Sequence, residues 1–131
     1  MSAQWVRIAS MALRLLFLIQ LILGLLFWFG KADGLVPLHM LVGLLFVIVL
    51  WYLGVVQGLQ RNGSLGLTVG TFLLGLLIAI VGMTQTAILI GGAHWIVQVF
   101  HLLLGVSGIG LGEACVARYK RGASEGSPAA Q

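Results

Sequence analysis

The sequence predicts an all-α integral membrane protein, a four-helix bundle with an up-down-up-down topology. The chain has 131 residues, of which 60% are hydrophobic and only 8% are charged. Soluble domains carry about a quarter charged residues, and disordered chains have low hydrophobicity, so both classes are excluded. The charges also leave long gaps, because residues 34–60 and 62–112 contain no Asp, Glu, Lys or Arg. A bilayer crossing needs about 20 such residues.

We expect a bundle over residues 1–119, with four membrane-spanning helices at about 8–29, 37–59, 65–88 and 93–119. Pro37 suits the first turn of the second helix, where its missing N–H has no partner to lose. Asn-Gly-Ser at 62–64 and the glycine pair at 91–92 separate the later helices. The polar segment 120–131 is predicted to be a disordered cytoplasmic tail. Short connections favour antiparallel neighbours, which makes the second and fourth helices diagonal partners.

The basic residues predict the orientation of the bundle. The side that holds both termini and the second connection carries six of them, namely Arg7, Arg14, Arg61, Arg118, Lys120 and Arg121. The opposite side carries Lys31 alone. Since cytoplasmic loops hold the excess of Lys and Arg, both termini are expected to be cytoplasmic, in the inner membrane if the source is bacterial.

The single cysteine, Cys115, excludes several classes of site. No internal disulfide can form, and a thiol oxidoreductase that needs paired cysteines is ruled out. A cysteine-based zinc or iron–sulfur site is ruled out as well. The net charge of +4 follows from the orientation of the chain, so no nucleic-acid partner is expected.

The three histidines, His39, His94 and His101, lie on the second and fourth predicted helices, towards their outward ends. Ionisable side chains at membrane depth are costly, and they are functional by default. His39 is followed four residues later by Gly43, and His101 by Gly105. Residues i and i+4 share a helix face, so each glycine lies one turn below its histidine and gives a planar macrocycle room to approach the backbone. The alternative for these glycines is close helix packing.

Polar and small residues on the fourth helix recur at steps of three or four: His94, Gln98, His101, Gly105, Gly108 and Gly112. Such spacing places them on one helix face. We expect this stripe to face the bundle core, opposite His39 and Gly43 on the second helix.

This pattern resembles the small four-helix membrane cytochromes b, in which two histidines on different helices hold a haem. The resemblance rests on residues 39–43 and 101–105. It implies one haem b per chain in the outer half of the bundle, with His39 and His101 as axial ligands and metal-binding residues. Gly43 and Gly105 would face the ring. Two-haem members need four ligands, so a second haem is not expected in a chain with three histidines.

The resemblance implies an electron carrier, or the haem subunit of a quinone-linked complex with a redox partner protein, rather than a stand-alone enzyme. Whether His94 is a ligand stays open. It could instead join a polar rim that binds haem propionates or a quinone headgroup, together with Lys31, Thr84, Gln85, Thr86 and Gln98.

Three other functions remain open. A cofactor-free structural or assembly subunit would use the histidines for packing. A zinc or copper site could use all three, although His94 and His101 are about 10 Å apart along a helix axis. A small transporter ranks last, because the first helix lacks a membrane-embedded carboxylate.

Two further features bear on packing. Arg14 and Glu113 could pair between neighbouring helices, or Arg14 could extend to the cytoplasmic interface. The spacings Gly66-x3-Gly70 and Gly108-x3-Gly112 could mediate helix contacts or a homodimer.

Overall fold

The computed structural model describes residues 2–125, and over that range the chain is helical with no strand. The elements in chain order are α1 (Ala3–Trp28), η1 (Asp33–Leu35), α2 (Val36–Gly58), α3 (Leu65–Thr84), η2 (Gln85–Ala87) and α4 (His94–Glu125). The four α-helices are long and apolar enough to cross a membrane. The predicted all-α fold class is therefore confirmed, and the described chain is compatible with an integral multi-pass membrane protein.

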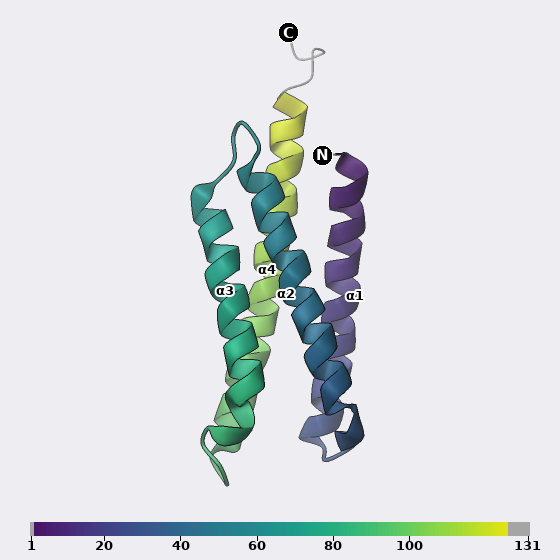
Figure 1. Cartoon of the computed structure of the whole chain (residues 1–131), viewed down its shortest axis with the longest axis vertical. Helices are drawn as coiled ribbons and strands as arrows, with labels where there is room; N and C mark the ends of the chain where they lie inside the picture. Colours follow the sequence, from purple (N-terminus) through teal and green to yellow (C-terminus); the bar gives the residue numbers. More distant parts are fainter. Residues whose placement is uncertain (1, 126–131) are drawn as a thin grey trace.

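The helices form an elongated bundle in which α2 and α4 are the central pair. Successive helices run in opposite directions, and the start of α1, the α2–α3 loop and the end of α4 lie at one end (Figure 1). α2 packs against α1, α3 and α4, and α4 also packs against α1 and α3. Helices α2 and α4, which were expected to be diagonal partners, are thus in direct contact across the middle of the bundle.

The ends of three helices differ from the predicted ones. α1 begins at Ala3 rather than at residue 8, and α3 ends at Thr84 rather than at residue 88. α4 continues to Glu125, so the segment 120–125 is helical and not the predicted disordered tail. Its Lys, Arg, Ala and Glu residues favour a helix, and Asn62 of the α2–α3 loop hydrogen-bonds Glu125. Residues 126–131 of the predicted tail lie outside the described residues.

Small residues permit the close approach of α2 and α3. A Cβ on Gly54 would collide with Thr71, and a Cβ on Gly75 would collide with the Trp51 indole. The indole Nε1 in turn donates to the Thr71 carbonyl at 3.1 Å. This contact joins the two helices below their loop.

The α2–α3 loop is held by Gln57, whose side chain is fully buried. Its Nε2 donates to the Ser64 carbonyl at 2.9 Å and lies 3.0 Å from the Thr68 hydroxyl oxygen. Its Oε1 accepts from the Ser64 N–H at 3.1 Å. Both ends of the amide are therefore paired, as a buried polar side chain requires.

The two glycine spacings have different surroundings. Gly108 is buried against Phe46, and a Cβ on Gly112 would collide with Leu13, so this pair mediates contacts inside the bundle. A Cβ on Gly70 would lie 3.7 Å from Leu111 of α4, whereas Gly66 meets only its neighbour Ser64. The Gly108-x3-Gly112 face is consequently not free to bind a second copy.

Candidate functional site

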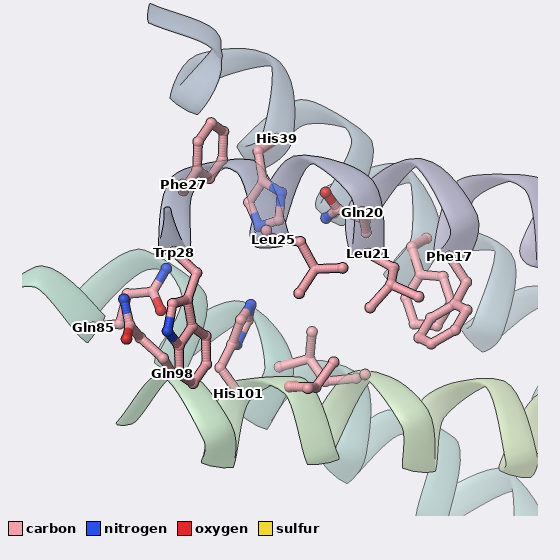
Figure 2. Close-up of a pocket in the computed structure, with 16 residues that line it drawn as sticks. Phe17, Gln20, Leu21, Leu25, Phe27, Trp28, His39, Gln85, Gln98 and His101 are labelled. Carbon is pink, nitrogen blue, oxygen red and sulfur yellow. The ribbon is translucent and has the colours of Figure 1, made fainter. Parts of the chain in front are cut away.

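The imidazoles of His39 and His101 approach each other inside the half of the bundle away from the α2–α3 loop. Their ring centroids are 6.3 Å apart, and the ring planes make an angle of 59°. Figure 2 shows His39 and His101 directed into one space from opposite walls. His39 also meets Phe27 of α1 edge-on, with 5.3 Å between ring centroids. Two helices distant in sequence thereby bring two nitrogen donors to one place.

The spacing of the two rings can be compared with that of two ligands on one metal ion. A metal–nitrogen bond is about 2.0–2.1 Å, and an imidazole centroid lies about 1.1 Å behind the coordinating nitrogen. Two imidazoles on opposite sides of one ion therefore have centroids about 6.2–6.4 Å apart. The observed 6.3 Å between His39 and His101 falls within this range.

Each histidine ring lies against a glycine of a neighbouring helix. A Cβ on Gly24 of α1 would lie 3.9 Å from the His39 Cε1 atom, and a Cβ on Gly82 of α3 would lie 3.0 Å from the His101 Cε1 atom. The second distance is tighter than an ordinary contact, so any side chain at Gly82 would press on the ring. The sequence pattern did not indicate that Gly24 and Gly82 contact the histidines. The relative rotation of neighbouring helices decides which glycine faces a histidine.

Gly43 and Gly105, which were expected to face a haem ring, line the cavity. Both face side chains of α1 across it. A Cβ on Gly43 would collide with the Gln20 amide, and a Cβ on Gly105 would lie 3.6 Å from the Phe17 ring. A ligand that reaches these glycines must therefore also contact Gln20 and Phe17.

The cavity between the histidines has a volume of about 130 Å³ and is walled mainly by α1 and α4. Leu21 and Leu25 of α1 extend into the space between the two helices (Figure 2). Ligand pockets for drug-sized molecules usually measure about 300–1,000 Å³. A macrocycle would therefore need these leucines and Leu102 to turn outwards, and Leu25 and Leu102 already lie on the exposed surface of the bundle.

Three buried polar atoms around the cavity have no hydrogen-bond partner among the described residues: Gln20 Oε1, His39 Nδ1 and His101 Nδ1. More than nine in ten buried polar groups in proteins are paired. By contrast, the buried Gln57 amide at the other end of the bundle is fully paired. Three unpaired buried polar atoms at one cavity leave hydrogen-bonding capacity for water or for a polar ligand.

His94 is not part of this pair. Its Nδ1 atom lies 3.2 Å from the Ile88 carbonyl oxygen in the α3–α4 connection, and its side chain does not line the cavity. Within residues 2–125, no three His, Cys, Asp or Glu side chains gather to hold a metal ion. The interpretation of all three histidines as one zinc or copper site is therefore wrong for the described chain.

Two of the predicted rim residues, Gln85 of η2 and Gln98 of α4, line the cavity. Both lie beside the Trp28 indole of α1 (Figure 2). Lys31, Thr84 and Thr86 are exposed and do not line the cavity. This part of the cavity thus offers neutral amide donors and an aromatic ring, but no cation.

No protein family matches this chain, and neither a curated protein nor a solved structure shows significant similarity to it.

Proposed function

We propose that the chain is a multi-pass membrane protein that binds one haem b and carries electrons. The observation that carries this proposal is the 6.3 Å separation of the His39 and His101 ring centroids, which suits two axial ligands of one iron. The three unpaired buried polar atoms at the cavity are in keeping with a polar ligand there. Haem supplies a one-electron couple, and ligation by two histidines leaves no open site for oxygen.

Each part of the site has a distinct task in this proposal. His39 and His101 provide neutral nitrogen ligands from the two central helices. Gly24 and Gly82 leave room for the two imidazoles to lie close to the neighbouring helices. The apolar walls exclude water and influence the reduction potential. Gln85 and Gln98 are placed to donate hydrogen bonds to propionates, or to a quinone that exchanges electrons with the haem.

The orientation follows from the charges. The end with the α2–α3 loop carries most of the basic side chains. The cavity is lined by residues near the opposite end, among them Trp28, His39 and Gln85. The positive-inside rule then makes both termini cytoplasmic and puts the haem in the outer half of the membrane. The electron donor and acceptor, a quinone or a redox protein, would meet the chain near that outer face.

A cofactor-free structural or assembly subunit is the second candidate, and the small cavity favours it. At about 130 Å³ the cavity holds a few water-sized groups unless its leucines move. In that case His39 and His101 would be packing residues whose free nitrogens contact water or a partner subunit.

One spectroscopic experiment separates the two candidates. The protein is purified in neutral detergent after expression with sufficient haem supply, and absorption spectra are recorded oxidised and dithionite-reduced. A low-spin b-type spectrum with about one haem per chain is expected, and a pyridine haemochrome assay gives the stoichiometry. A folded protein without bound haem, which also fails to take up added haemin, would favour the structural subunit.

A further inference from the structure

A second hollow lies at the other end of the bundle, between the α2–α3 loop and the last turns of α4. It has a volume of about 360 Å³ and is lined by Asn62, Gly63, Arg118, Arg121, Gly122 and Glu125. We call it the Arg118 hollow. It shares no residue with the histidine cavity, so a ligand of the Arg118 hollow would bind independently of haem.

The walls of the Arg118 hollow are held by hydrogen bonds between its two elements. The Arg118 Nε atom donates to the Asn62 carbonyl at 3.0 Å. The Asn62 side chain donates to the carboxylate of Glu125, which lies three residues after Gly122. Arg118 has five N–H donors. Among residues 2–125 this is the one hydrogen bond that its side chain is seen to make, which leaves its terminal amino groups for a ligand. The hollow is thus an ordered feature of the described chain.

The charge of this end is strongly positive. The α2–α3 loop and the last turns of α4 carry Arg61, Arg118, Lys120 and Arg121 against the single acid Glu125. Among the described residues the one ion pair within 4 Å joins Arg14 to Glu113. Lys120 also interacts electrostatically with Glu113, so within the described chain Arg61, Arg118 and Arg121 are the cations of this end without an ion pair. The Glu125 carboxylate already accepts a hydrogen bond from Asn62. The unpaired cations favour an anionic ligand.

The position of the hollow indicates where that anion comes from. α2 ends at Gly58 and α3 begins at Leu65, so the hollow is level with the ends of two apolar spans, where lipid phosphates lie. The leucines that flank the loop, Leu59 and Leu65, are 76% and 77% exposed and can contact acyl chains. Arginine pairs with phosphate oxygens through two parallel hydrogen bonds.

We propose that the Arg118 hollow binds the phosphate group of an anionic phospholipid, with Arg118 and Arg121 as its ligands. Basic pockets beside membrane helices suit such headgroups because charge and hydrogen bonding act together. A free phosphate offers the same charge and the same oxygens, but it lacks acyl chains to contact Leu59 and Leu65.

The proposal is tested by measuring which lipids the purified protein retains. Native mass spectrometry in neutral detergent compares dioleoyl phosphatidylglycerol with dioleoyl phosphatidylcholine at equal concentration. The wild-type chain should prefer the anionic lipid by about tenfold. The Arg118→Gln/Arg121→Gln variant should bind both lipids within about twofold of each other. The matched control is Arg7→Gln/Lys31→Gln, which removes two cations outside the hollow and should keep the preference.

Two further measurements control for misfolding of the variants and for binding of free phosphate. Circular dichroism checks that each variant folds, and the single change Arg121→Gln replaces the double variant if the loss of Arg118 prevents folding. Inorganic phosphate at millimolar concentration is added as the competing source of the anion. The proposal is overturned if phosphate displaces the lipid completely, if wild type shows no preference, or if the control loses the preference as the hollow variant does.

Discussion

Arg14 of α1 and Glu113 of α4 form a bidentate ion pair. The Arg14 Nε atom lies 2.7 Å from Glu113 Oε1, and the second nitrogen lies 2.8 Å from Oε2. Of the two predicted alternatives, pairing is therefore observed rather than extension of Arg14 to the interface. Their side chains are 61% and 39% exposed on the outside of the bundle, so the pair faces lipid or another protein rather than the core. In hydrocarbon each charge reduces the cost of placing the other there.

The ion pair leads to a first prediction. Glu113→Gln leaves the Arg14 guanidinium unpaired in an apolar segment, so we expect a lower melting temperature in detergent and less protein in the membrane fraction. Exchanging the two charges, with Arg14→Glu and Glu113→Arg together, should recover most of the loss. Asp33→Asn removes an exposed carboxylate outside this pair and serves as the control. If the exchanged variant is no better than Glu113→Gln, the charges do not act as a pair.

A second prediction concerns the histidines. His39→Ala and His101→Ala should each abolish stable haem binding, because one axial ligand is lost in each case. His94→Ala should leave most of the haem in place, since His94 faces the Ile88 carbonyl and does not line the cavity. The Soret absorbance per milligram of protein and the pyridine haemochrome assay measure the haem content. Full low-spin haem in His101→Ala, or equal loss in all three variants, would contradict the assignment of the ligands.

A third prediction addresses the loop network. Gln57→Leu leaves the half-buried Ser64 N–H without its partner. We expect unfolding in detergent to become easier by about 1–3 kcal/mol. Haem content should stay unchanged, because the network lies at the opposite end from the cavity. Gln60→Leu is the matched control, since Gln60 makes one long bond of 3.4 Å to the Val56 carbonyl. Equal destabilisation in both variants would mean that the network adds nothing specific.

The sequence predicted the helices well because four apolar runs separated by turns leave few alternatives. Helix ends were less predictable, since α4 continues to Glu125, whose side chain contacts Asn62 from a distant part of the chain. The repeated His-x3-Gly spacing pointed to His39 and His101, the two histidines that the structure brings together. It could not reveal that Gly24 and Gly82 face the imidazoles, nor that Gln20 covers Gly43. Those relations depend on how each helix is rotated about its own axis.

The last prediction rests on the different amounts of space that Gly82 and Gly24 leave beside the two histidine rings. A Cβ at Gly82 would lie 3.0 Å from the His101 Cε1 atom, whereas a Cβ at Gly24 would lie 3.9 Å from that of His39. Gly82→Ala should therefore displace the His101 ring by a few tenths of an ångström and lower the affinity for haem. Gly24→Ala should be tolerated, because its new methyl group meets the ring at an ordinary contact distance. Gly110→Ala, with nothing within 4 Å, is the control for adding a methyl group to a helix.

The haem-free protein separates a ligand-positioning role of Gly82 from simple helix packing. If Gly82 positions His101, Gly82→Ala should shift the Soret band or weaken haem binding while the apo-protein melts near the wild-type temperature. If Gly82 serves packing alone, the apo-protein should lose about 1–3 kcal/mol through overpacking. Haemin titration followed by absorbance, together with thermal melts of the apo-protein, gives both quantities. A clearly destabilised apo-protein with unchanged haem affinity would show that Gly82 does not position His101. The His101 ring would then tolerate the added methyl group and keep its place opposite His39.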